Sequence, residues 1–350
     1  MQIDVEKLQT LLDEAVASGE EDSCQLAIYQ SGKLAVDICA GKNICCDNLF
    51  PVYSVSKGIT SVLAHILFQE GKLDFAAPVA EYWPEFACNG KEKVKVWHIF
   101  SHRAGLWEMP LLENFDEQAD WAKMVGYMQQ SKPVSEVGGK CHYHGITFGW
   151  LAGEVIARAG KKAFNELLKE KILQSLQLTD EWFFGTSEAA EKRLIMPVAA
   201  TYWNFCDWRN VFITSPQIRK SCIPSANGFG SARAVGKVYA ALSGNGVDGV
   251  RLLRDETVSQ AVKSCRADFD PLPEGMGAWA HFGLGFALAG PPEQPGAIFG
   301  HGGALGSEGL AIPEQELAIG FTKNKFNATH PVHPLRDRIS QALGIKIRHW

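Results

Sequence analysis

Residues 52–71 read VYSVSKGITSVLAHILFQEG, and this stretch decides the fold. After Ser54, apolar residues recur at the three- and four-residue spacing of one helical face: Ile59, Val62, Leu63, Ile66 and Leu67. Gly71 is typical of the position just beyond a helix end. The stretch therefore predicts a helix that begins beside Ser54, with Lys57 one turn further along the same face.

Ser54 and Lys57 together suggest nucleophilic chemistry. A serine hydroxyl attacks a carbonyl only when a neighbouring base removes its proton. Burial and nearby positive charge lower the pKa of a lysine amine from about 10.4, so that Lys57 can act as that base. The start of the helix adds backbone N–H donors that favour an oxyanion. The spacing alone is weak evidence, because a chain of this composition contains about one Ser-x-x-Lys by chance. The competing interpretation is a helix-capping serine followed by a surface lysine.

The composition is that of an ordinary globular protein. The chain has 350 residues, of which 46% are hydrophobic and 21% charged, enough for one large domain or two smaller ones. The net charge of -5 gives no reason to expect nucleic acid or an anionic membrane as a partner. No run approaches the roughly 18 apolar residues that a membrane span needs. We therefore expect a small-molecule substrate, and nothing in the sequence sets the oligomeric state.

The N-terminus and the cysteines favour the cytoplasm. The segment 1–7, MQIDVEK, lacks the basic region and apolar stretch of a secretory signal. The nine cysteines are an odd number and include no Cys-x-x-Cys, so we expect reduced thiols rather than a disulfide framework or a zinc site. No cofactor or metal is expected.

The order of predicted elements indicates one sheet built from both ends of the chain. Helices are expected over 5–17, 148–159, 163–176, 232–242 and 334–343, and strands over 24–29, 34–39, 282–287, 309–312 and 317–321. The predicted fold class is α/β (α+β): an antiparallel sheet flanked by helices, with a mostly helical insertion. Residues 1–75 and 226–350 would form the α/β domain and residues 76–225 the helical domain, with the active site between them.

Several blocks resemble the serine β-lactamase-like superfamily, which includes class C β-lactamases, DD-peptidases and family VIII carboxylesterases. In chain order the blocks are VYSVSKGIT (52–60), GKLDFAAPV (71–79), YWPEF (82–86), WHIFSHRAGL (97–106), YH (143–144), PSANGFGSAR (224–233) and FGHGG (299–303). They span nearly the whole chain, and several ordered blocks are far more specific than Ser-x-x-Lys alone. The likeness is greatest to the esterase-type members, and it implies a β-lactamase/transpeptidase-like fold.

The resemblance assigns a third catalytic group and an oxyanion site. The family's second motif falls on Tyr143-His144-Gly145, which makes Tyr143 the residue that shares the proton network and protonates the leaving group. Gly145 stands where lactamases have an asparagine that holds an amide of the substrate. A core tyrosine with a bonded hydroxyl is the competing interpretation of Tyr143.

The third motif falls on His301-Gly302-Gly303, followed by Ala304. The resemblance implies an edge strand beside the site, with the backbone amides of Ser54 and Ala304 as oxyanion donors. His301 replaces a lysine with a group of pKa near 6.5, so a substrate carboxylate is less clearly required. The alternative is a glycine-rich turn between strands.

Other patterns carry less weight. Gly185-Thr186-Ser187-Glu188-Ala189 falls short of the Gly-x-Ser-x-Gly elbow and is expected to be a loop. Cys141, His142 and His144 lack any metal-binding pattern. His98 and His102 are expected on one helix, where they satisfy buried polar groups. Trp107, Trp203 and Trp208 either shape an apolar acyl pocket or belong to the core.

These observations predict a serine hydrolase that forms an acyl-enzyme on Ser54 and acts on carboxylic esters. A β-lactam or peptide amide hydrolase with the same machinery is the second interpretation. A binding or scaffold protein that kept the fold and lost activity is the third.

Overall fold

The structure is a computed structural model that describes residues 2–198, 213–266, 281–326 and 334–347. Its main sheet has the strand order β2-β1-β9-β8-β7-β6, and every neighbouring pair is antiparallel. The strands are β1 (Ser23–Gln30), β2 (Lys33–Gly41), β6 (Ala287–Leu288), β7 (Phe299–Gly302), β8 (Glu308–Ile312) and β9 (Leu317–Lys323). The predicted fold class, a mixed fold with an antiparallel sheet and flanking helices, is confirmed.

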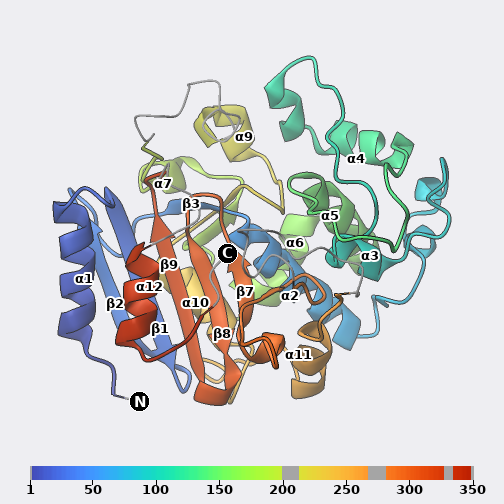
Figure 1. Cartoon of the computed structure of the whole chain (residues 1–350). Coiled ribbons are helices and arrows are strands. Elements are labelled where there is room, and N and C mark those ends of the chain that lie inside the picture. Colours follow the sequence, from blue (N-terminus) through green and yellow to red (C-terminus); the bar gives the residue numbers. More distant parts are fainter. Residues whose placement is uncertain (1, 199–212, 267–280, 327–333, 348–350) are drawn as a thin grey trace.

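The two ends of the chain meet inside this sheet. β1 pairs with β9 from Cys24, opposite Lys323, to Gln30, opposite Leu317. The hairpin of β1 and β2 therefore forms one edge of the sheet, and the C-terminal strands form the rest (Figure 1). The domain boundaries at residues 75 and 226 stay predictions.

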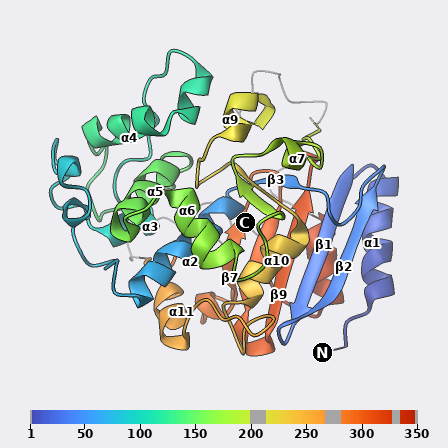
Figure 2. The same cartoon turned by 180° about the vertical axis from the view of Figure 1, so that it is seen from behind.

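Helices cover both faces of the sheet. α1 (Val5–Ala17) and α12 (Pro334–Ala342) lie on one face, where Leu8 and Leu12 are buried in a cluster with strand residues (Figure 1). α10 (Ala232–Ala240) covers the opposite face, as the view from behind shows (Figure 2). Each helix turns an apolar stripe to the sheet, as an amphipathic surface helix does.

The helical region lies beside the sheet and carries a second, smaller sheet. That sheet has the order β3-β5-β4, from Phe50–Tyr53, Gly228–Gly230 and Trp182–Phe184. Besides α2, the remaining elements of the described chain are helices: η1 (Val79–Glu81), η2 (Pro84–Phe86), α3 (Val96–Phe100), η3 (Phe115–Ala119), α4 (Trp121–Gln130), α5 (Thr147–Gly160), α6 (Phe164–Leu168), η4 (Lys169–Leu173), α7 (Glu188–Glu191), α9 (Pro216–Lys220), α11 (Asp255–Ala261), η6 (Pro295–Ala297) and η7 (Pro313–Gln315).

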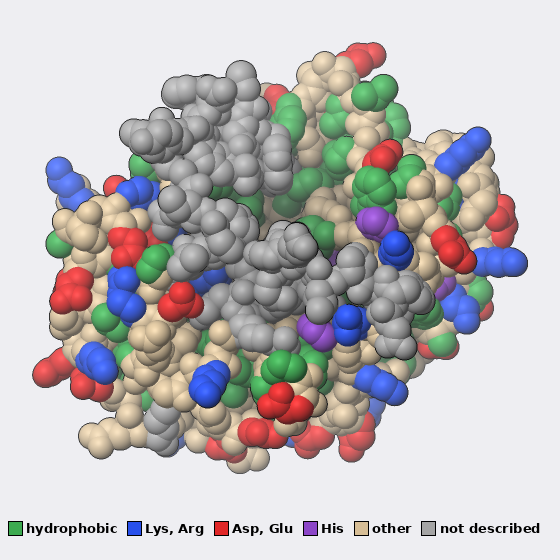
Figure 3. Space-filling view, in the orientation of Figure 1, with side chains coloured by type: hydrophobic (Ala, Val, Ile, Leu, Met, Phe, Trp, Pro, Cys, Tyr) green, Lys and Arg blue, Asp and Glu red, His purple; other side chains and the backbone are tan. Residues whose placement is uncertain are grey.

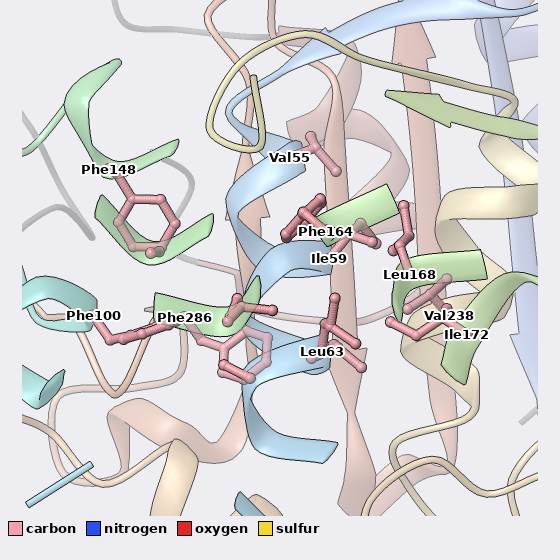
Figure 4. Packing of buried hydrophobic residues seen from close by; sticks show 14 of the residues in the cluster. Val55, Ile59, Leu63, Phe100, Phe148, Phe164, Leu168, Ile172, Val238 and Phe286 are labelled. Carbon is pink, nitrogen blue, oxygen red and sulfur yellow. The ribbon is translucent and has the colours of Figure 1, made fainter. Parts of the chain in front are cut away.

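α2 (Val55–Gln69) is the most deeply buried helix of the part of the chain that the structure describes, since every residue from Val55 to Leu67 is buried. Its side chains Val55, Ile59 and Leu63 pack among residues of surrounding helices and of the turn that precedes β6 (Figure 4). Those neighbours are Phe100, Phe148, Phe164, Leu168, Ile172, Val238 and Phe286. A helix that is packed all round has no solvated face, so every polar group on it needs a partner in the protein.

Two buried ion pairs lie at the end of the main sheet where β8 begins and β9 ends. Lys323, at the end of β9, pairs with Glu21, and both side chains are buried. Arg336 of α12 lies 3.3 Å from the buried carboxylate of Glu308 in β8. The polar end of β9 is therefore satisfied inside the protein, and these pairs fasten the strand to the N-terminal segment and to α12.

Two predicted elements differ in the structure. The strand expected over 282–287 is reduced to β6, because the chain turns at Gly285, whose φ is +86° and whose amide bonds to the carbonyl of Phe100. The helix expected over 163–176 is regular only in α6 and continues as the π-helical η4. None of the helices in the described ranges is long and apolar enough to cross a membrane.

Gly285→Ala tests how tightly this turn is pressed against α2. A Cβ at this position would lie 2.1 Å from Ser61 Oγ, and the positive φ disfavours any L-residue. We expect the free energy of unfolding to fall by about 1–3 kcal/mol in urea denaturation. Gly126→Ala is the matched control: Gly126 lies in α4, where an added Cβ would meet nothing within 4 Å, so stability should stay equal or rise. Equal stability of both variants would contradict this account of the turn.

Candidate active site

Ser54 lies where β3 ends and α2 begins. Tyr53, the residue before it, has a φ of +49°, a left-handed conformation that is unfavourable for a bulky residue. The turn places Ser54 at the N-cap of α2, partly exposed to solvent while the residues on both sides are buried. Its hydroxyl is therefore accessible to a substrate at the positive end of a 15-residue helix.

Lys57 lies one turn into α2, on the same face as Ser54. Its Nζ is 3.0 Å from Ser54 Oγ and 2.9 Å from the carbonyl oxygen of Ser225. The side chain is fully buried, and this burial holds the pKa of the Lys57 amine well below its usual range. A neutral amine with a free electron pair beside a serine hydroxyl can accept its proton.

Tyr143 is the third member of the group. Its ring centroid lies 4.9 Å from Lys57 Nζ. Burial raises the pKa of Tyr143, and a hydrogen bond with the Ser54 side chain opposes that rise. The structure thus brings Tyr143 to Ser54 and Lys57, although Tyr143 follows them by more than 80 residues in the chain. A protonated phenol beside Ser54 and Lys57 can pass a proton to a leaving group.

β7 borders the site on the side of the sheet. A Cβ at Gly303, just after β7, would lie 2.2 Å from the carbonyl oxygen of Val52, so only glycine allows this approach to β3. The Gly303 amide donates to the Ser307 carbonyl at 2.7 Å and closes a tight turn. Ala304 lies in this turn and is exposed, next to the strand that leads into Ser54.

His301 and Gly302 lie in β7 and are buried. The Cβ of His301 lies 3.5 Å from the position of a Cβ on Gly58, so the ring is on the side of β7 that faces α2. Its Nδ1 is 2.8 Å from the Gly302 carbonyl oxygen. Burial and the nearby Lys57 lower the pKa of His301 to about 3. His301 is therefore neutral at physiological pH and supplies no charge for a substrate carboxylate.

An apolar cavity of about 520 Å³ opens beside Tyr143. Its lining consists of Trp107, Met109, Pro110, Leu111, Leu112, Phe115, Gln118, Tyr143, Gly145 and Ile146. The lining includes no charged side chain, and its size is within the usual range for small-molecule sites. Hydrophobic side chains gather on this face beside the lobe that carries α4 (Figure 3). Trp107 is therefore a pocket residue, whereas Trp203 and Trp208 lie outside the described residues.

Two contributors to this arrangement had no predicted role. The carbonyl oxygen of Ser225 accepts a hydrogen bond from the Lys57 amine. Ser56 Oγ accepts a hydrogen bond from the Gly228 amide at 2.9 Å, and this bond holds the start of α2 against β5. A backbone carbonyl leaves no residue-type signature, so only the block 224–233 could have drawn attention to this segment.

The remaining predicted patterns have structural roles. Ser187 caps α7 by accepting from the Ala190 amide at 3.2 Å, which agrees with a loop rather than a nucleophile elbow. His98 lies on α3, but His102 lies beyond the end of that helix, so the two do not share a helix as predicted. Within the described ranges, no three His, Cys, Asp or Glu side chains are grouped to hold a metal ion. The cysteines of these same ranges are thiols and form no disulfide with one another.

Sequence comparison identifies relatives along almost the whole chain. The family model described as Beta-lactamase matches residues 8–344. The chain is 31% identical over 338 residues to the "Esterase/beta-lactamase LipL" of Mycobacterium tuberculosis (strain ATCC 25618 / H37Rv), covering 86% of this chain and 76% of that protein. It is 28% identical over 196 residues to a β-lactamase of Yersinia enterocolitica, covering 54% and 47% of the two chains.

Solved structures share the fold. A family VIII carboxylesterase superposes with a TM-score of 0.86 at 24% identity, covering 98% of both chains. A penicillin-binding protein homologue from Caulobacter crescentus has a TM-score of 0.84 at 24% identity, again covering 98% of both chains. With the family match over nearly the full length, the chain is a member of the β-lactamase family of serine hydrolases.

Proposed function

We propose that the protein hydrolyses uncharged carboxylic esters through an acyl-enzyme on Ser54. The observation that supports this most directly is the fully buried amine of Lys57, 3.0 Å from Ser54 Oγ and with a strongly lowered pKa. Burial shifts this amine toward its neutral form, and the neutral form can remove the serine proton. A solvated surface lysine would be protonated and could not.

Each group has a defined role in the proposed acylation. Lys57 Nζ accepts the Ser54 proton while Oγ attacks the ester carbonyl, and the amides of Ser54 and Ala304 stabilise the oxyanion. As the tetrahedral intermediate collapses, the Tyr143 hydroxyl protonates the departing alkoxide and regains a proton from the Lys57 ammonium. The products of this half-reaction are a free alcohol and an ester of Ser54 with the acyl group.

Deacylation repeats the chemistry with water as the nucleophile. Lys57 and Tyr143 remove a proton from water as its oxygen attacks the acyl carbonyl, and the oxyanion forms in the same site. The Ser54 oxygen then leaves and takes up that proton from the Lys57 and Tyr143 pair. The carboxylic acid is released and the serine hydroxyl is restored.

Three features favour an ester with an apolar, uncharged acyl group. His301 is neutral, and the cavity beside Tyr143 has no charged lining residue. Gly145 stands where lactamases carry the asparagine that holds a substrate amide. A site without a cation or an amide partner at these positions gives little binding energy to a β-lactam carboxylate or to its side-chain amide.

A β-lactam or peptide amide hydrolase is the second candidate, because relatives of this chain carry the name β-lactamase. Comparing nitrocefin with a p-nitrophenyl ester on the same preparation separates the two. The third candidate, a protein without catalysis, predicts that a fluorophosphonate leaves Ser54 unlabelled.

Ser54→Ala should reduce hydrolysis of p-nitrophenyl butyrate to the uncatalysed rate, because no other group can form the acyl-enzyme. Lys57→Met should lower kcat/KM by on the order of 10²-fold or more. The controls are Ser264→Ala and Lys93→Met, which change exposed side chains. Turnover by Ser54→Ala at the wild-type rate would show that the nucleophile is a different residue.

The activity should depend on the protonation of Lys57. Below its pKa the residue is an ammonium ion that cannot accept the serine proton, so kcat/KM should fall as the pH falls through this pKa. Because burial places the pKa well below the usual value of about 10.4, the activity should reach its plateau well below pH 10. A profile of kcat/KM against pH that still rises at pH 10 would mean that Lys57 is not the base.

Gly145 should set the length of the acyl group that the cavity accepts. A Cβ at Gly145 meets nothing within 4 Å, so a larger side chain would enter the cavity. In Gly145→Leu, the ratio of kcat/KM for the octanoate to that for the acetate p-nitrophenyl ester should fall about tenfold or more. Gly126→Leu is the matched control, since Gly126 also has open space but does not line the cavity. An unchanged ratio would place the acyl group elsewhere.

A further inference from the structure

The segment that carries Tyr143 has no regular backbone structure. Residues 141–144 are neither helix nor strand, and α5 begins only at Thr147. Proton transfer between Ser54, Lys57 and Tyr143 requires the phenol to be placed to within a fraction of an ångström. Since no backbone ladder holds this segment, its position must come from other contacts.

A single residue, His102, binds the backbone on both sides of Tyr143. Its carbonyl oxygen accepts from the His142 amide at 2.9 Å, and its ring Nδ1 accepts from the His144 amide at 3.2 Å. The ring of His102 also lies against that of Tyr143, with centroids 4.7 Å apart. The ring and the carbonyl of His102 therefore hold the backbone amides of the two residues on either side of Tyr143.

The backbone of His102 is adapted to this task. Its φ is +61°, a left-handed conformation that non-glycine residues rarely adopt. This conformation lies just past the end of α3 and presents the ring and the carbonyl of one residue to the same neighbouring segment. Unfavourable conformations of this kind persist where the surrounding contacts impose them, and they gather at functional sites.

His144 holds the other side of the segment. Its Nε2 accepts from the Leu106 amide at 3.2 Å, so Nδ1 carries the proton and donates to the His142 carbonyl at 2.7 Å. Both ring nitrogens are thus used, and only the neutral form of His144 makes both bonds. Burial favours this form by lowering the pKa of His144 to about 4 and that of His102 well below its usual range.

We propose that His102, with His144 as its partner, is the positioning residue that holds the Tyr143 hydroxyl in line with Ser54 and the leaving group. The proposal rests on the proposed function, in which Tyr143 protonates the leaving alkoxide. Neither histidine needs to touch the substrate; both act through the backbone at positions 142 and 144. The loss of either should therefore affect the transfer of the proton more than the binding of the ester.

A pair of esters with the same acyl group isolates this proton transfer. p-Nitrophenyl butyrate releases a phenolate that is stable without a proton, whereas ethyl butyrate releases ethoxide, which needs one. Both give the same butyryl-enzyme on Ser54, so deacylation is identical. The ratio of kcat/KM for the two esters therefore reports how well Tyr143 delivers its proton.

His102→Gly and His102→Asn form the decisive pair. Glycine accepts the left-handed φ but has no acceptor for the His144 amide, whereas asparagine tolerates this φ and places a carbonyl oxygen near the position of Nδ1. We expect the ratio of kcat/KM for p-nitrophenyl butyrate to ethyl butyrate to rise about 10- to 100-fold in His102→Gly, and to stay within about threefold of wild type in His102→Asn. KM should change little in either. Equal losses on both esters, or equal behaviour of the two variants, would overturn the proposal.

His144 supplies a second pair if His102→Gly fails to fold. His144→Gln keeps an acceptor for the Leu106 amide, and His144→Leu removes it. The ratio should rise in the leucine variant and be largely restored in the glutamine variant, while equal ratios in the two would count against the proposal. Matching thermal midpoints for both variants would separate positioning from a general loss of stability.

One measurement does not depend on activity. Labelling the seven tyrosines with 3-fluorotyrosine and assigning Tyr143 with Tyr143→Phe gives a ¹⁹F signal for the phenol itself. This signal should shift or broaden in His144→Leu and remain near the wild-type position in His144→Gln. If esterase activity is absent altogether, the proposed function fails, while an unmoved signal in His144→Leu refutes the positioning role by itself.

Discussion

The proposed mechanism depends on one constraint: the protein interior must keep the pKa of the Lys57 amine low. The packing of α2 meets this constraint, because the helix is enclosed by the sheet on one side and by aromatic and aliphatic side chains on the others (Figure 4). Contact with water would raise the pKa of Lys57 toward its usual value, so the dense packing around this residue is part of the proposed chemistry. The amine donates to Ser54 Oγ and to the Ser225 carbonyl oxygen, so its polar atom has partners in the protein interior.

The groups around this amine are placed by two kinds of structure. Ser54 and Lys57 sit on a rigid helix, and β7 brings the turn at Ala304 to them through a glycine contact at Gly303. Tyr143, in contrast, sits on an irregular segment and relies on side-chain hydrogen bonds for its position. The fold thus positions the proposed nucleophile and its proposed base, and local polar contacts position Tyr143. This arrangement follows a general pattern in which a rigid scaffold positions functional residues that lie on loops.

The sequence predicted those parts of the molecule that depend on local pattern. The helices near 5–17 and 55–69 and the hairpin of β1 and β2 follow from hydrophobic spacing and turn residues. The ordered sequence blocks, which contain Ser54, Lys57 and Tyr143, identified the family to which the chain belongs. The strand predicted over 282–287 was mostly wrong, because the turn at Gly285 is set by contacts with α2 and α3, which are distant in sequence. The Ser225 carbonyl was beyond prediction, since a backbone atom has no residue-type signal. The position of His102 was also missed, because it depends on a left-handed backbone just past a helix end.

The pairing of β1 with β9 has a consequence for how this protein is made. Cys24 leaves the ribosome early, yet its partner Lys323 follows about 300 residues later. The β1–β2 hairpin therefore has no neighbouring strand while the helical region is synthesised. Pairing between strands so far apart in sequence gives the fold a high contact order, and the unpaired edge of β1 is exposed to chaperones and to aggregation during this time. The proposed nucleophile, Ser54, is likewise synthesised long before the turn at Ala304. Nascent or prematurely terminated chains thus carry the serine without the turn beside it, and the completed site arises only when the last strands join the sheet.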